Sequence, residues 1–205
     1  MNYQFRELTN SDIPDALAIV GQHTSDHFIS VSKKYIQEYM TAETGIALVA
    51  ETSDESIIGY AIGVVYTEET PVKEFDIRHP TVIEYPEYPV LLLKQCYIDS
   101  DYQGVGIGTE FIVELINWGL REFSVNGVFV ECWVKPATRS SDELFSSLPV
   151  FTEAYHSESY YSTYESESSK ECKGCLQELR DCECSGSIYI ADDVPLFLEL
   201  MEGRG

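Results

Sequence analysis

The sequence has few basic residues: 13 Lys and Arg stand against 35 Asp and Glu, which gives a formal net charge of -22. Proteins that bind the phosphate backbone of nucleic acids need clusters of Lys and Arg, and this chain has none. We therefore expect no nucleic-acid partner. The acidity fits a surface that stays hydrated in a high-salt cytoplasm, and it also fits attraction of cationic amines. Charge alone identifies no substrate.

The sequence also lacks a long hydrophobic run. No apolar stretch approaches the roughly 18 residues that span a bilayer, and the polar residues 1–7 do not resemble a signal peptide. We expect a cytoplasmic protein with no membrane partner. The 205 residues, 44% of them apolar, predict one domain over 1–205 with a sizeable core.

Hydrophobic periodicity predicts strands and helices in alternation, with 67–89 as a long loop. The predicted strands are 3–8, 46–50, 57–66, 90–98, 128–134, 151–156 and 187–190. The predicted helices are one that begins at caps Asn10 and Ser11 and ends near Gly21, then 32–42, 109–121, 139–148 and 196–201. Residues 160–170 fit a loop or an exposed hairpin. This order of elements predicts an α/β (α+β) domain with a mixed sheet.

A glycine-rich turn, Gln103-Gly104-Val105-Gly106-Ile107-Gly108, lies between a near-continuous apolar strand and the clearest helix. Glycines let the backbone approach a ligand closely, and free N–H groups at a helix start bind phosphate oxygens. The glycines are not spaced as Gly-x-Gly-x-x-Gly, and no Lys-Ser/Thr pair follows. Dinucleotide and nucleoside-triphosphate sites are therefore excluded, and an anion site of another kind is predicted.

In this strand–turn–helix–strand context, the turn resembles the pyrophosphate-binding signature of the GNAT superfamily of acyl-CoA-dependent N-acyltransferases. That signature is usually written Gln/Arg-x-x-Gly-x-Gly/Ala, and Gln103, Gly106 and Gly108 fill its positions. The resemblance covers roughly residues 3–156 and is sharpest over 90–134. It implies a GNAT-like fold, in which a central mixed, mostly antiparallel sheet is flanked by helices.

The resemblance also implies acetyl-CoA as co-substrate and a site for it in two parts. The CoA pyrophosphate would be held by the backbone of Gln103, Gly104, Val105, Gly106, Ile107, Gly108 and Thr109. The strand end formed by Cys96, Tyr97 and Ile98 would pair with the pantetheine arm. An N–H there, expected from Ile98, would polarise the thioester carbonyl.

The implied reaction is transfer of an acetyl group to a primary amine by direct attack, without a covalent enzyme intermediate. The acceptor is expected to be a small-molecule or peptide amine. Dimers are common in the family, so a homodimer is a further expectation. A second reading from another class stays open: a catalytically weak acyl-CoA-binding module that acts in protein interaction or regulation.

The general acid of the family is often a Tyr in the helix after the fifth strand, following an Asn near its start. This chain departs from that pattern, because Lys135 and Pro136 stand where the Asn is expected and Phe145 occupies the Tyr region. The second reading gains support from this departure. Tyr155 and Tyr160 are the substitute acids that we consider.

An alkyl amine is almost wholly protonated at neutral pH, so a general base or a water relay is useful. Glu87, in the loop that enters the strand 90–98, is one candidate. Glu131, within the strand 128–134, is the other. Each also fits an ordinary solvated or polar-face charge, so position alone does not choose between them.

The six cysteines are of two kinds. Cys96 and Cys132 lie in apolar runs and are predicted to pack in the core. The other four crowd into a polar insertion over 169–186: Cys172, Cys175, Cys182 and Cys184. Zinc prefers four thiolates in tetrahedral geometry, although the second pair here has one intervening residue instead of two. We predict a structural zinc site that stabilises a small loop near the C-terminus, with iron or disulfides as alternatives.

Overall fold

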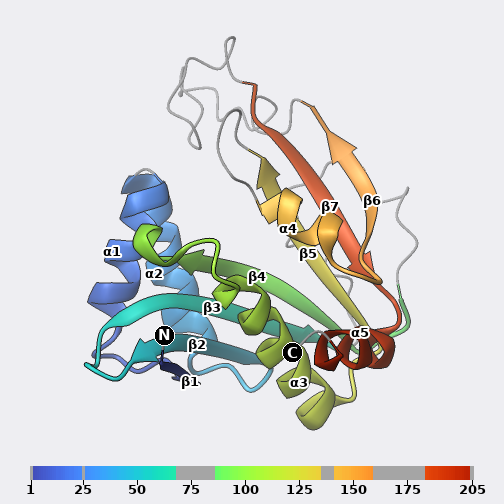
Figure 1. Ribbon diagram of the computed structural model, residues 1–205, viewed down its shortest axis with the longest axis horizontal. Helices are drawn as coiled ribbons and strands as arrows, with labels where there is room; N and C mark the ends of the chain where they lie inside the picture. The colour runs from blue at the N-terminus through green and yellow to red at the C-terminus, as the bar shows by residue number, and fades with distance from the viewer. Residues whose placement is uncertain (1, 25, 68–85, 135–140, 159–182, 204–205) are drawn as a thin grey trace. The chain divides into compact units, whose positions relative to one another are not determined.

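The computed structural model describes residues 2–24, 26–67, 86–134, 141–158 and 183–203 (Figure 1). These residues contain seven strands and five α-helices. The chain divides into two compact units, residues 1–65 with 91–124 and residues 66–90 with 125–205. The α/β class that the sequence predicts is confirmed, and two pairings of strands within each unit are antiparallel.

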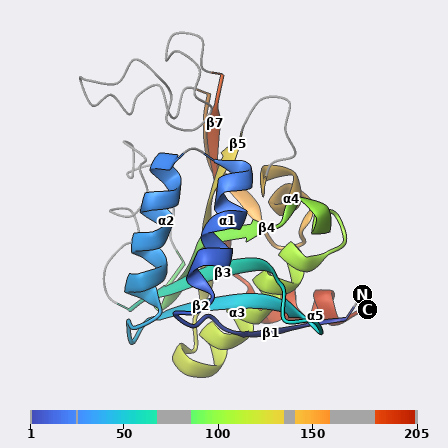
Figure 2. The same cartoon turned by 90° about the vertical axis from the view of Figure 1, so that its left-hand side faces the viewer.

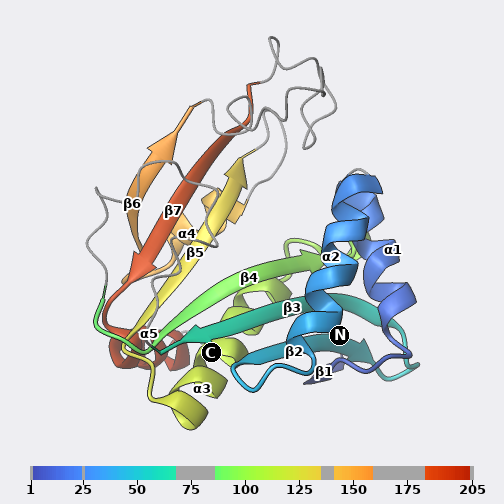
Figure 3. The same ribbon diagram turned by 180° about the vertical axis from the view of Figure 1, so that it is seen from behind.

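The first unit is a four-stranded sheet with helices on both faces. Its strands lie in the order β1 (Tyr3–Glu7), β2 (Gly45–Thr52), β3 (Ile57–Tyr66) and β4 (Val90–Ile98). Its helices are α1 (Ile13–His23), α2 (Asp26–Tyr39) and α3 (Ile107–Phe123). Comparison of Figures 1 and 3 places α3 on one face of the sheet and the α1–α2 pair on the other. Figure 2 shows α1 and α2 side by side.

Strand β3 forms the middle of this unit. Residues 58–65 are all buried, as expected for an apolar strand covered on both faces. Gly59 on β3 has no Cβ, and this leaves room for the side chains of Ile98 on β4 and Phe111 on α3. A Cβ at Gly59 would lie 2.9 Å from Cδ1 of Ile98 and 3.1 Å from the ring of Phe111. This close approach seats α3 against the end of β4.

The second unit contains a three-stranded sheet in the order β5 (Gly127–Val134), β7 (Ser185–Ala191) and β6 (Thr152–Ser157). Helix α4 (Ser141–Ser147) packs on it through Phe145, whose ring lies 6.0 Å from that of Tyr189. Helix α5 (Val194–Glu202) packs through Phe197 on Phe151, with ring centroids 5.5 Å apart. Rows of buried apolar residues on the strands supply the core.

Helix α2 begins at Asp26, six residues before the predicted start at Ser32. The extra turns include Ile29, whose side chain lies 3.4 Å from where a Cβ on Gly21 would be. Contact between α1 and α2 therefore stabilises turns that carry no clear apolar stripe of their own, which is why periodicity missed them.

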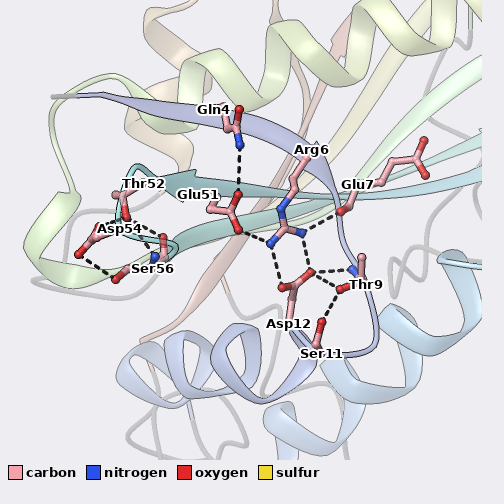
Figure 4. Close-up of polar contacts among 10 residues, drawn as sticks. All are labelled: Gln4, Arg6, Glu7, Thr9, Ser11, Asp12, Glu51, Thr52, Asp54 and Ser56. Carbon is pink, nitrogen blue, oxygen red and sulfur yellow. Dashed lines mark hydrogen bonds and ion pairs between the residues drawn. The ribbon is translucent and has the colours of Figure 1, made fainter.

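A cluster of charges joins β1, β2 and the start of α1 (Figure 4). The Arg6 guanidinium donates to both Asp12 carboxylate oxygens, at 2.7 and 3.0 Å, and to Glu51 at 2.6 Å. Asp12 also accepts from the backbone N–H of Thr9 at 2.7 Å. Asp12 occupies the N-cap position of α1, in place of the two earlier residues that the sequence predicts, but its carboxylate bonds Arg6 and Thr9 and makes no capping hydrogen bond to the helix. Arg6 holds the pKa of the Asp12 carboxyl well below its ordinary value.

Candidate functional site

The glycine-rich turn leads directly into α3. Gly104 and Gly106 have φ angles of 77° and 101°, in the left-handed region that other residues rarely adopt. A Cβ on Gly106 would meet open space, since the nearest atom, Oε1 of Glu110, lies 4.0 Å away. Backbone conformation, and not crowding, therefore requires glycine at this position.

The first N–H groups of α3 point out of the helix start toward this turn. Gly106 is the N-cap and offers no side chain to cap them. The first intrahelical bond runs from the Glu110 N–H to the Gly106 carbonyl at 3.1 Å, so residues 107–109 have no acceptor within the helix. Residues 103–106 are exposed, while Ile107 is buried and anchors the helix. This is the geometry of an anion site.

The end of β4 lies just before the turn. The N–H of Asp99 donates to the carbonyl of Ile58 on β3 at 3.0 Å. Because successive residues of a strand present their backbone groups to opposite edges, Ile98 presents its N–H and C=O away from β3. The predicted polarising N–H of Ile98 thus faces the edge that a ligand strand would need.

Cys96 is exposed, so the prediction that it packs in the core is wrong. Residues 90–93 of β4 are buried, whereas the second half of the strand is half-buried or exposed. An apolar run in the sequence does not reveal where the covering elements stop. Cys132 on β5 is fully buried, as predicted, and burial raises the pKa of its thiol.

Side chains of α1 hold the link between β4 and the turn. Nε2 of His23 lies 2.7 Å from the carbonyl oxygen of Ile98, and Nε2 of Gln103 lies 3.3 Å from the same oxygen. Gln22 donates to the Asp99 carboxylate at 2.8 Å and accepts from the N–H of Ser100 at 2.9 Å. Sequence reasoning missed Gln22 and His23, because it ended this helix at Gly21.

The residues that precede and follow the turn along the chain are neutral or acidic. No Lys or Arg occurs between residues 95 and 120, while Asp99, Asp101 and Glu110 lie in or beside the turn. Glu110, in the first turn of α3, accepts a hydrogen bond from the Tyr3 hydroxyl at 2.7 Å. Burial and this carboxylate raise the pKa of Tyr3 to about 12. Backbone amides and the helix dipole are the groups of this segment that would hold an anion.

Two of the candidate acid–base residues share a face of the second unit. Glu131 on β5 and Tyr155 on β6 are both paired in register with Ile188 of β7, which lies between them. Residues in lateral register point to the same face, and two strand spacings separate the pair by about 10 Å. Both side chains are half-buried. The sequence predicted them separately, and the sheet brings them onto one surface.

Glu87 is exposed, in the segment that enters β4. Asn126 holds that segment, because its N–H and side-chain amide donate to the carbonyls of Pro89 and Tyr88, at 2.8 and 2.9 Å.

The ring of Phe145 is buried against Phe151 and Tyr189, so a core side chain occupies the sequence position where the family often places its acid. Tyr160 lies outside the described residues.

Three of the four predicted metal ligands, Cys172, Cys175 and Cys182, also lie outside the described residues. Cys184 precedes β7 and is fully buried. Within the ranges that the structure describes, no three His, Cys, Asp or Glu side chains are grouped to hold a metal ion. Nor does that part of the chain contain a helix with the length and apolar character to cross a membrane.

Comparison with known families gives one match that covers more than half of the chain. The model of the acetyltransferase (GNAT) family matches residues 16–148. This region includes β4, the turn and α3. No curated protein matches the chain at the level of sequence.

Several solved structures share the fold at low sequence identity. Arabidopsis thaliana NAA60 with a bisubstrate analogue has a TM-score of 0.63 and 14% identity, over 92% of this chain and 97% of that one. The Escherichia coli ribosomal-protein-S18-alanine N-acetyltransferase gives 0.57 and 19%, over 94% and 95%. The Vibrio cholerae spermidine/spermine N-acetyltransferase SpeG gives 0.59 and 11%, over 97% and 98%. At these identities the likeness shows a shared fold.

Proposed function

The chain belongs to the GNAT family of acetyltransferases and is an acyl-CoA-dependent N-acetyltransferase, and we propose that the start of α3 binds the acetyl-CoA pyrophosphate. The observation that carries this proposal is a helix N-terminus whose cap is a left-handed glycine, Gly106, with no capping side chain. The binding groups are the backbone N–H groups of 103–109, aided by the helix dipole.

In this proposal the strand end Cys96, Tyr97 and Ile98 lies along the pantetheine arm. The N–H of Ile98 donates to the thioester carbonyl and stabilises the oxyanion that develops during attack. The amine nitrogen forms a bond to the carbonyl carbon, and the carbon–sulfur bond breaks. The amine loses a proton to a base, and the departing thiolate takes one from an acid.

We assign the base to Glu131 and the acid to Tyr155, which lie on one face of the second unit. Their backbones lie about 10 Å apart, so each side chain can exchange a proton without bonding to the other. Glu87 is the alternative base and Tyr160 the alternative acid. Glu131→Gln and Tyr155→Phe each lower kcat in this assignment, whereas Glu87→Gln leaves it unchanged.

The proposed acceptor is a primary amine, carried by a small molecule or by a peptide. A net charge of -22 favours approach of a cationic amine. Similar structures include an enzyme named for a ribosomal-protein alanine and one named for spermidine and spermine. Spermidine and a short peptide with an N-terminal alanine are therefore the first two acceptors to assay. Gel filtration of the same sample tests the expected homodimer.

We further propose that one domain spans 1–205 and that the insertion 169–186 binds structural zinc. Four thiolates, from Cys172, Cys175, Cys182 and Cys184, suit tetrahedral zinc and leave no open position for chemistry. The complete burial of Cys184 places one of these thiols away from solvent. Metal analysis should find one zinc per chain, lost in Cys172→Ser and kept in the control Cys96→Ser. Absence of metal from the wild type contradicts the site.

Calorimetric titration with acetyl-CoA tests the central proposal. Gly106→Glu places a strained residue and a negative charge at the start of α3, so binding should weaken at least about 100-fold. Gly203→Glu is the matched control, since Gly203 has an ordinary backbone conformation, with its φ at -72°, and a Cβ there would make only ordinary contacts, the nearest at 3.7 Å. Equal affinity in the wild type and Gly106→Glu would place the cofactor elsewhere.

A further inference from the structure

The last two residues of α1, Gln22 and His23, contact the short segment that joins β4 to the glycine-rich turn. In the proposed function this segment connects the two points that hold acetyl-CoA, the N–H of Ile98 and the N–H groups at the start of α3. The distance between these points has to match the distance from thioester to pyrophosphate. What fixes the segment therefore matters for the reaction.

His23 fixes the peptide that follows Ile98. A carbonyl oxygen can only accept, so Nε2 of His23 carries a hydrogen and donates it to Ile98 at 2.7 Å. Gln103 donates to the same oxygen at 3.3 Å. With two donors on that oxygen, the peptide plane between Ile98 and Asp99 cannot rotate without losing both bonds. The N–H of Ile98 belongs to the preceding peptide, so these bonds hold it from its C-terminal side.

The His23 ring is itself held by a stack of aromatic rings. It lies on Tyr97, with centroids 6.1 Å apart and planes at 22°, and Tyr97 lies on Tyr60 at 5.7 Å and 23°. Tyr60 is fully buried and donates to Gln95 at 3.0 Å, and Gln95 donates to Ser32 of α2 at 3.1 Å. The core of the first unit therefore supports His23, the donor to the Ile98 carbonyl. It also supports Tyr97, which shares with Ile98 the peptide that carries the Ile98 N–H.

Gln22 fixes the next two residues. Its amide donates to the carboxylate of Asp99 and accepts the N–H of Ser100, at 2.8 and 2.9 Å. Asp99 in turn accepts from the N–H of Asp101 at 3.0 Å. Each of residues 98–101 therefore makes at least one hydrogen bond, and Gln22 and His23 of α1 supply one for each of residues 98–100.

We propose that Gln22 and His23 are positioning residues for acetyl transfer, which hold the Ile98 N–H in line with the thioester carbonyl. The inference rests on the proposed function, since it assigns that N–H a role in acyl-CoA binding. Neither side chain needs to contact the substrate.

Binding of two ligands without any amine tests this role: acetyl-CoA, and S-ethyl-CoA, which lacks the carbonyl. The wild type should prefer acetyl-CoA by about fivefold, the contribution of one hydrogen bond. His23→Phe keeps an aromatic ring on Tyr97 and removes the donor, so the preference should fall below about twofold while S-ethyl-CoA affinity stays the same. His23→Gln restores a donor and should restore the preference.

A second pair of variants covers the case in which His23→Phe does not fold. Gln22 is exposed, so Gln22→Ala should fold, and it should lower the preference for acetyl-CoA by about twofold. Gln37→Ala, at an exposed position of α2, should not change it. Full preference in both His23→Phe and Gln22→Ala would overturn the positioning role, as would a wild type without preference. A wild type that binds neither ligand would instead contradict the proposed function.

Discussion

The two ends of α1 are held by different chemistry. At its start, Arg6 forms charged hydrogen bonds with Asp12 and Glu51, while at its end Gln22 and His23 hold β4 and the turn through amide and imidazole groups. The first cluster lies away from the anion site and the second lies beside it. A cation, Arg6, stabilises the fold at the first end, whereas the proposed anion site at the second end offers backbone amides. The difference indicates that stability should respond to the first cluster and ligand binding to the second.

The largest effect is expected on stability, from Asp12→Ala. Asp12 is 7% exposed, and its loss leaves Arg6 with a single carboxylate partner and removes the acceptor of the Thr9 N–H. The free energy of unfolding should fall by about 3 kcal/mol, measured by urea denaturation. Acetyl-CoA affinity of the folded variant should not change. Asp15→Ala, at an exposed position of the same helix, is the control, and an equal loss there would contradict the comparison.

The contact between Arg6 and Asp12 should also make the free energy of unfolding depend on pH. Arg6 lowers the pKa of Asp12 in the folded protein below the ordinary value of 3.8. The carboxylate therefore stabilises the fold fully above that value, and its contribution is lost as the pH falls toward the lower, folded-state pKa. Between pH 5 and pH 2.5 the wild type should lose about 1.5 kcal/mol more than Asp12→Asn. Parallel curves for the two proteins would exclude this role.

Salt should strengthen the binding of acetyl-CoA at the glycine-rich turn, whereas salt usually weakens the binding of a charged ligand. The acidic chain and the acidic residues at the turn repel the phosphates of acetyl-CoA, and salt screens that repulsion. Affinity for acetyl-CoA should rise about tenfold between 0.1 and 1 M KCl, measured by calorimetry. A site that relied on Lys or Arg would lose affinity instead, so a fall would indicate a cation outside the turn.

The smallest effect is expected from Glu110→Gln, which removes one negative charge from the first turn of α3. Acetyl-CoA affinity should rise by about threefold, and Gln keeps an acceptor for the Tyr3 hydroxyl. Glu114→Gln, one turn further along the helix at an exposed position, should change the affinity less. An equal rise in acetyl-CoA affinity in the two variants would mean that the affinity depends on the net charge of the protein and not on the position of the charge.

The sequence was sufficient for features that depend on neighbouring residues. The bounds of β4 agree with the predicted strand 90–98, because a near-continuous apolar run identifies a covered strand. The position of Gly106 was also predictable, since a left-handed residue that begins a helix is a local requirement. Helix α3 begins at Ile107, two residues before the predicted start.

Features that depend on distant residues were not predictable. The register of β5, β7 and β6 places Glu131 and Tyr155 on one face, and no pattern within either strand encodes that register. The contact of His23 with Ile98 joins residues 75 positions apart. The exposure of Cys96 depends on where its covering elements end. Each of these follows from packing between elements, which periodicity does not report.

Helix α1 has 11 residues, so its two anchored ends lie about 16 Å apart. A rigid helix of this length transmits a displacement of one end to the other. The N-terminal strand and the residues that follow it should therefore be intolerant in a deep mutational scan that selects for acetyl transfer. The same residues should be the point at which a fused tag or a proteolytic cut, far from the turn in sequence, slows the enzyme.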